Sequence, residues 1–227
     1  MTGRISLRER VLPTYTKGEE IFNMVSHIVG GGIGIATLIF SILIPALRGS
    51  VTGVLCGTVF GSSMILLYTM SSIYHGLHRG TAKKVFQVMD HCTIYLLIAG
   101  TYTPILVCSM AKEFPVAAWL TFAAVWGLAI LATTLTAIDL NKFKVFSMIC
   151  YVGMGWSVMF SLRQAILSLG LVGFLWVLLG GIFYTGGVIF FRVGKKKKYF
   201  HSIFHLMVLA GSLCHVTAIL FYVLINA

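Results

Sequence analysis

Long uninterrupted apolar stretches are the feature of this sequence that most limits its fold. An α-helix needs about 20 consecutive apolar residues to cross a bilayer, and seven stretches of roughly that length can be identified. They cover residues 21–47, 51–75, 86–110, 115–138, 143–162, 169–191 and 200–225. Membrane-spanning β-strands would alternate apolar and polar residues, and these stretches do not. The sequence therefore predicts an all-α membrane protein, folded as a seven-transmembrane helix bundle.

Composition agrees with this fold class and limits the number of domains. Of the 227 residues, 58% are hydrophobic and only 10% are charged, whereas soluble domains have about 25% charged residues. Residues 1–20 are polar and basic, without the early apolar stretch of a signal peptide. We expect a retained cytoplasmic N-terminal segment at residues 1–20 and one transmembrane domain at residues 21–227.

The positive charges lie mainly on one side of the expected bundle. They are Arg4, Arg8, Arg10 and Lys17 before the first stretch, Arg79, Lys83 and Lys84 after the second, Lys142 and Lys144 after the fourth, and Arg192 and residues 195–198 after the sixth. The other side has only Arg48, Lys112 and Arg163. Because cytoplasmic loops are enriched in Lys and Arg, the N-terminus is expected in the cytoplasm. Seven spans then place the C-terminus outside.

The net charge of +11 indicates lipid contact rather than nucleic acid binding. The basic residues lie in short loops, with no basic face interleaved with aromatic residues. We expect membrane lipids as partners, with anionic headgroups at the basic cytoplasmic loops, in a multi-pass protein of the cell (inner) membrane. The five cysteines form no CxxC pair and lie in or near apolar stretches, so we interpret them as packing residues.

Local features refine the helices. The turn at residues 48–50 is short enough to predict a tight hairpin between the first two helices, and the glycines of the first helix favour close packing. Gly100 and Pro104 predict a bend in the third helix.

His201 and His205 begin the last apolar stretch with a spacing of four residues. On a helix this spacing places both imidazoles on one face, where they can bind one metal ion. Polar side chains inside a bilayer are costly and are usually functional. The alternative is an interfacial pair of histidines beside the lysine cluster.

The expected topology brings further polar residues to the same leaflet. Ser71 and His75 share a face at the cytoplasmic end of the second helix, and Asp90 lies about one turn inside the third. The other acidic residues fall in the N-terminal segment, at helix ends or in loops: Glu9, Glu19, Glu20, Glu113 and Asp139. Asp90 therefore either orients a metal-bound water or pairs with Arg79, Lys83 or Lys84 at the interface.

Zinc suits a site of neutral imidazoles with one position left open, and it supports hydrolysis of amides and esters. Calcium and magnesium need several oxygen ligands, and only one carboxylate is available. A serine-hydrolase triad of Ser71, His75 and Asp90 would leave His201 and His205 unexplained, and no GxSxG sequence is present.

The remaining histidines have weaker claims to a metal. His215 lies ten residues beyond His205, about 15 Å along a helix, and we expect it to form an interhelical hydrogen bond. His27 is either structural or lines a cavity, His78 is expected in solvent, and His91 points away from Asp90. We expect Tyr74, Tyr95 and Tyr102 to pack or to line a lipid cavity.

Four motifs occur in a family-specific order. They are Ser71-Ser72-Ile73-Tyr74-His75, Met89-Asp90-His91, Ile98-Ala99-Gly100-Thr101-Tyr102-Thr103-Pro104, and His201-Ser202-Ile203-Phe204-His205 with His215 after it. This order resembles the bacterial hemolysin III proteins of the progestin and adipoQ receptor family, which includes the adiponectin receptors. The resemblance covers essentially the whole chain.

The resemblance implies a zinc ion near the cytoplasmic leaflet. His75, His201 and His205 match the three histidine ligands of the family, Asp90 matches the carboxylate near the metal-bound water, and Ser71 matches the serine of the first motif. It further implies a zinc-dependent, ceramidase-like intramembrane hydrolase of lipid amides or esters that contributes to membrane lipid homeostasis.

Two alternatives to this hydrolase stay open. One is a non-enzymatic sensor or homeostasis protein with structural zinc, and the other is a hemolysin-type cytolytic protein. The N-terminal segment is too short to carry over the hormone recognition of the receptors.

Overall fold

The computed structural model of the chain describes Leu7 and residues 9–194 and 197–227, and the described part contains helices but no strands. Arg4, Arg8, Lys195 and Lys196, which contribute to the predicted charge asymmetry, lie outside the described residues.

The helices follow one another along the chain with short turns between them. In order they are α1 (Lys17–Leu47), α2 (Val51–Gly76), α3 (Thr81–Pro104), the π-helix η1 (Ile105–Met110), α4 (Ala111–Glu113), α5 (Pro115–Ile138), α6 (Lys144–Gly155), the 3₁₀-helix η2 (Ser157–Ser161), α7 (Leu162–Val193), α8 (Phe200–Ala218), the π-helix η3 (Ile219–Val223) and the 3₁₀-helix η4 (Leu224–Asn226).

Six helical segments of the described chain are long and apolar enough to cross a membrane. They are Lys17–Leu47, Val51–Gly76, Thr81–Glu113, Pro115–Ile138, Lys144–Val193 and Phe200–Asn226. The protein is therefore a multi-pass helical membrane protein, as the apolar stretches predict.

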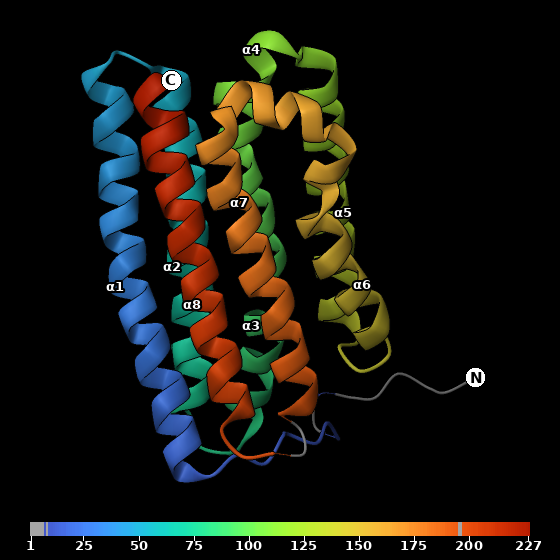
Figure 1. Cartoon of the computed structure of the whole chain (residues 1–227). Helices are drawn as coiled ribbons and strands as arrows, with labels where there is room; N and C mark the ends of the chain where they lie inside the picture. The colour runs from blue at the N-terminus through green and yellow to red at the C-terminus, as the bar shows by residue number, and fades with distance from the viewer. Residues whose placement is uncertain (1–6, 8, 195–196) are drawn as a thin grey trace.

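The segment Lys144–Val193 explains why six segments correspond to seven apolar stretches. It contains 50 residues, whereas a single crossing needs about 20. Figure 1 shows the chain following α6 and η2 along the bundle, crossing over one end and returning along α7. Gly170 interrupts α7 with a φ of 69°, a left-handed conformation that glycine adopts without steric cost. The count of seven membrane spans stays a prediction.

Close helix packing begins with the hairpin of α1 and α2, which the short turn at residues 48–50 predicts. Gly49 adopts a φ of 71° in this turn, and the Ser50 side chain accepts a hydrogen bond from the Gly53 N–H at the start of α2. Further along, a Cβ added at Gly57 would collide with the carbonyl oxygen of Ser41. The two backbones therefore approach as closely as small residues allow in lipid.

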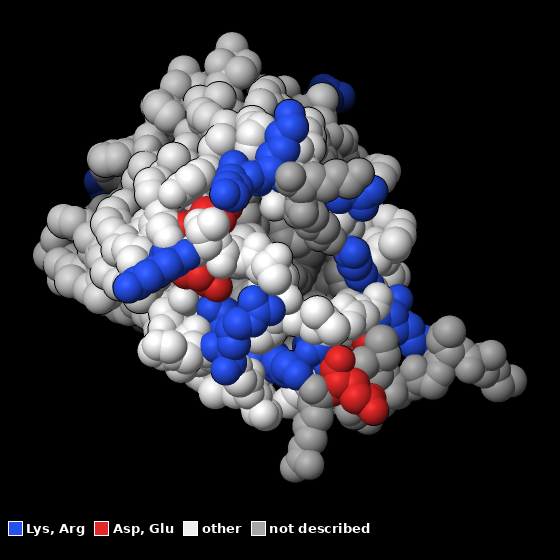
Figure 2. Space-filling model, turned by 90° about the horizontal axis from the view of Figure 1, so that it is seen from below, with Lys and Arg blue, Asp and Glu red and all other residues white. Residues whose placement is uncertain are grey.

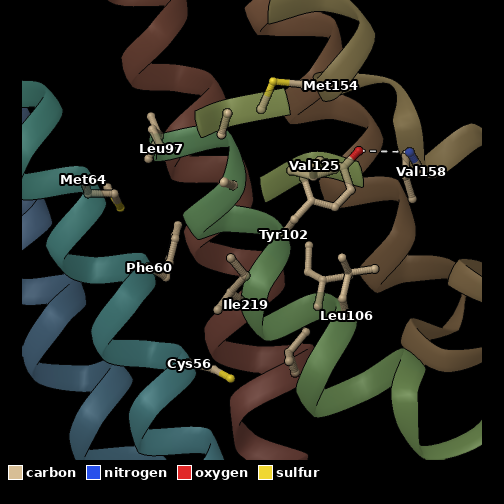
Figure 3. Packing of buried hydrophobic residues seen from close by; sticks show 14 of the residues in the cluster. Cys56, Phe60, Met64, Leu97, Tyr102, Leu106, Val125, Met154, Val158 and Ile219 are labelled. Atoms are coloured by element: carbon tan, nitrogen blue, oxygen red, sulfur yellow. Dashed lines mark hydrogen bonds between the residues drawn. The ribbon is translucent and has the colours of Figure 1, made fainter. Parts of the chain in front are cut away.

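The apolar core lies between α2, α3, α5, α6, α7 and α8, with further residues from the short helices η1, η2, η3 and η4 (Figure 3). Tyr102 connects α3 to the junction of α6 and η2, because its hydroxyl donates to the Gly155 carbonyl and accepts from the Val158 N–H, both at 2.9 Å. Directly after Pro104 the α-helix gives way to the π-helix η1. The bend predicted at Gly100 and Pro104 stays a prediction.

One end of the bundle is basic. The start of α1 and the turns α2–α3, α5–α6 and α7–α8 all lie at this end, while the C-terminus lies at the other (Figure 1). Viewed onto this end, Lys and Arg side chains surround a few acidic ones (Figure 2). We call this the basic end.

Candidate metal centre

Three histidines from opposite ends of the sequence meet at the basic end. His75 lies in the last turn of α2, and His201 and His205 occupy the first turns of α8. Their possible ligand atoms all lie within 4.8 Å of one another, and the residues are 3%, 7% and 1% exposed. The end of α2 and the start of α8 lie at the same end of the bundle, so His201 and His205 are level with His75. We call these residues the histidine cluster.

Two ring nitrogens of the histidine cluster are spaced as two ligands of one metal ion would be. The Nε2 atoms of His201 and His205 lie 3.2 Å apart, close to the roughly 3.3 Å that separates two nitrogens on a tetrahedral zinc with Zn–N bonds of about 2.05 Å. The Nε2 of His75 is buried and has no hydrogen-bond partner among the described residues, which costs about 1–3 kcal/mol unless something binds it. A purely imidazole donor set suits zinc and not calcium or magnesium.

Glu20 is part of the site. From the sequence it is expected only in the N-terminal segment or at a helix end. Its Oε2 accepts a hydrogen bond from Nδ1 of His75 at 2.7 Å, and its Oε1 accepts one from Nζ of Lys83 at 2.7 Å. The salt bridge of Lys83 is therefore with Glu20 and not with Asp90, which corrects one of the alternatives considered for Asp90.

Two further polar residues of α1, Asn23 and His27, are buried at the site. The His27 ring stacks on His205 with a centroid distance of 3.8 Å, and both of its nitrogens are buried without hydrogen-bond partners in the described part of the chain. Asn23 is fully buried, and its side-chain amide also lacks a described partner. Glu20, Asn23 and His27 are spaced i, i+3 and i+7 in an apolar helix, and this pattern is the sequence signal that could have revealed this face.

Tyr15 brings the segment before α1 into the site. Its ring stacks on His201 at 4.8 Å and lies 5.8 Å from the ring of His75. Burial, together with the nearby Glu20 and Asp90 carboxylates, raises the pKa of the Tyr15 phenol, so the ring is neutral at physiological pH. An uncharged aromatic ring therefore covers one side of the histidine cluster.

Ser71 and Asp90 lie in the same region, but within the described chain neither side chain is hydrogen-bonded to the histidine cluster. Ser71 is buried one turn before His75. The Asp90 carboxylate is 18% exposed and lies 4.0 Å from Nδ1 of His91. The roles expected of both residues stay predictions.

The other polar side chains mostly behave as expected. His215 on α8 donates from Nε2 to the Val177 carbonyl on α7 at 3.1 Å, which confirms an interhelical hydrogen bond. His78 is exposed, as expected. Nδ1 of His91 donates to the Gln87 carbonyl at 2.8 Å and lies 4.0 Å from the Asp90 carboxylate, although the sequence predicts that His91 points away from Asp90. Tyr95 and Tyr102 belong to the packed core.

The fold and the site define a class: a multi-pass helical membrane protein with a buried histidine cluster that could hold a metal. The family model described as "Haemolysin-III related" matches residues 15–216, and the chain belongs to this family. The resemblance based on the four motifs is thereby confirmed.

Several known proteins are similar to this chain. Hemolysin-3 of Bacillus cereus is 38% identical over 209 residues, covering 92% of this chain and 94% of the relative. The Hemolysin-3 homolog of Bacillus subtilis (strain 168) is 36% identical over 208 residues, covering 92% and 96%. The Monocyte to macrophage differentiation factor of Homo sapiens is 26% identical over 166 residues, covering 71% and 67%.

Proposed function

We propose that the protein binds zinc through His75, His201 and His205 and acts as an intramembrane hydrolase of lipid amides or esters. Such a ceramidase-like activity would contribute to membrane lipid homeostasis. The observation that supports this proposal best is the convergence of three buried imidazoles, one of which has an Nε2 without a described partner.

Asp90 and Ser71 have distinct roles in the proposed reaction. A zinc ion bound there would polarise a substrate carbonyl and lower the pKa of a bound water. Asp90, whose carboxylate is partly exposed, would orient that water and accept its proton. The Ser71 hydroxyl, one turn from His75, would donate a hydrogen bond to the carbonyl oxygen as negative charge develops on it. The apolar surroundings would exclude bulk water and accommodate acyl chains.

We further propose that the basic end faces the cytoplasm of a cell (inner) membrane protein with seven spans. This orientation would place the metal near the cytoplasmic leaflet and the basic residues beside anionic headgroups. The gathering of Lys and Arg at the end that also contains the histidine cluster supports it (Figure 2).

A non-enzymatic homeostasis protein with structural zinc is the second candidate. The stacking of Tyr15 on His201 and of His27 on His205 favours it, because these rings fill space beside two of the three imidazoles. A cytolytic protein is the third candidate, supported by the name Hemolysin-3 that two of the relatives have.

Metal analysis combined with lipid mass spectrometry distinguishes the hydrolase from a protein with structural zinc. The wild-type protein should contain zinc, and His205→Ala should lose it. Asp90→Ala should keep most of the zinc but lose lipid turnover, because the carboxylate is proposed to act on water rather than on the metal. Identical lipid profiles for wild type and both variants, with zinc in the wild type, would refute the hydrolase and favour structural zinc.

A further inference from the structure

We propose that Glu20 is a positioning residue for the metal, acting through His75, and that Lys83 holds the Glu20 carboxylate in place. This inference deepens the proposed function, because it rests on zinc binding by the histidine cluster. It concerns how one ligand is held in its binding form and is independent of the substrate.

The first step concerns which nitrogen of His75 is free. A carboxylate accepts hydrogen bonds only, so at 2.7 Å from Glu20 the Nδ1 of His75 must bear the proton. In the neutral ring the lone pair is then on Nε2, the buried atom without a described hydrogen-bond partner. Glu20 thus selects the tautomer that can bind zinc.

The second step concerns the contacts of Lys83, which hold Glu20 in place. Lys83 is 2% exposed, and its Nζ lies 2.7 Å from Oε1 of Glu20, 3.4 Å from the His75 carbonyl and 3.0 Å from the Leu77 carbonyl. These three acceptors use all the ammonium protons, and two of them are carbonyls at the C-terminal end of α2, where cations are favoured. Lys83 therefore fixes the backbone of His75, while Glu20 fixes its ring.

The third step separates this arrangement from an ordinary interhelical ion pair. The neighbouring Glu19 has a purely structural role, since its Oε2 accepts from the N–H and the hydroxyl of Thr16, and its Oε1 accepts from the Tyr199 N–H at 2.7 Å. Glu19 therefore caps α1 and connects it to the start of α8. Glu20 instead divides its two oxygens between a cation and a candidate ligand, the arrangement by which carboxylates orient metal-binding histidines.

Zinc affinity, measured by chelator competition on the purified full-length protein, tests the assignment. We compare wild type with Glu20→Gln, with the double variant Glu20→Gln/Lys83→Met, which leaves no uncompensated buried lysine, and with Glu19→Gln as the matched control. Both Glu20 variants should bind zinc about 10–100-fold more weakly, the usual effect of losing such a partner. Glu19→Gln should retain wild-type affinity. Substitution with Co²⁺ adds a spectroscopic readout, since the absorption bands should shift only in the Glu20 variants.

The possible outcomes are distinct. Wild-type zinc affinity and an unchanged Co²⁺ spectrum in the double variant would overturn the role of Glu20. An equal loss of affinity in Glu19→Gln would also overturn it, because it would show a general effect of the α1 start. A wild-type protein that binds no zinc would refute the proposed function together with this inference. Zinc binding that depends on Glu20, in a protein without lipid turnover, would refute only the hydrolase.

Discussion

At the scale of single residues, the three clustered histidines are not equivalent. His75 has a carboxylate on one nitrogen, whereas His201 and His205 face each other through their Nε2 atoms and have aromatic rings stacked on them. The carboxylate fixes the orientation of the His75 ring through a hydrogen bond, and the other two rings have no such carboxylate partner among the described residues. Loss of different histidines should therefore weaken metal binding to different extents.

Two histidines of α8 provide a matched test of the metal site. His205→Ala should reduce bound zinc to near zero, because two imidazoles alone bind the ion far more weakly than three. His215→Ala removes an imidazole from the same helix, breaks the hydrogen bond to the Val177 carbonyl and removes the ring contact with Tyr184. It should keep its zinc and lose stability, about 0.5–1.5 kcal/mol of it from the hydrogen bond alone. Zinc content and thermal unfolding should be measured for both variants. Equal zinc loss in both would contradict the proposed ligand set.

The sequence predicts the histidine cluster better than its surroundings. The i, i+4 spacing of His201 and His205 and the position of His75 at a helix end depend only on local helix geometry and chain direction. The contacts of Glu20 with His75 and Lys83 depend instead on how α1, α2 and α3 cross, which helical periodicity does not specify. The position of Tyr15 is not predicted either, because Tyr15 lies in an irregular segment before α1, where helical periodicity does not apply.

At the scale of helices, local signals predict some ends well and the interruptions poorly. The expected first and third helices begin at residues 21 and 86, whereas α1 and α3 begin at Lys17 and Thr81. The expected stretch 115–138 coincides with α5, and 51–75 differs from α2 by one residue. By contrast, α6 ends at Gly155 and gives way to η2, although the apolar pattern predicts one helix over residues 143–162. Apolar composition is the same for α-, 3₁₀- and π-helical turns, so such changes are decided by packing.

The closest approach of two helices gives a prediction about stability. Gly57→Ala should destabilise the protein by about 1–3 kcal/mol, because the added methyl group would meet the backbone of Ser41 and force α1 and α2 apart. Gly32→Ala is the control, since a Cβ there would have nothing within 4 Å among the described residues. Thermal or denaturant unfolding in detergent measures the difference. Equal stability of the two variants would show that the hairpin is less tightly packed than the structure indicates.

At the scale of the whole molecule, the basic end and the C-terminus lie at opposite ends of the bundle (Figure 1). The proposed orientation follows from charge, because segments rich in Lys and Arg are retained in the cytoplasm. In the proposed topology, the reversal of the chain between η2 and α7 would provide the additional crossing that seven spans require.

Reporter fusions test this orientation. A reporter fused after Ala227 should be active outside the cytoplasm, and one inserted after Lys142, in the turn between α5 and α6, should be active inside. Cytoplasmic activity of the fusion at Ala227 would mean an even number of spans. In that case α6 and η2 would not cross the membrane as a separate pass.

The origin of the three histidines in α2 and α8 has a consequence for biosynthesis. Glu20, His75 and Lys83 all precede the third helix or lie in its first turn, so they can meet early during membrane insertion. The two remaining imidazoles arrive only with the final helix. A chain that stalls or is truncated before α8 would contain the Glu20–Lys83 ion pair and His75 but would lack the other two imidazoles of the cluster. Completion of the cluster would thus coincide with completion of the chain, which makes metal loading suited to be the last event in maturation of the protein.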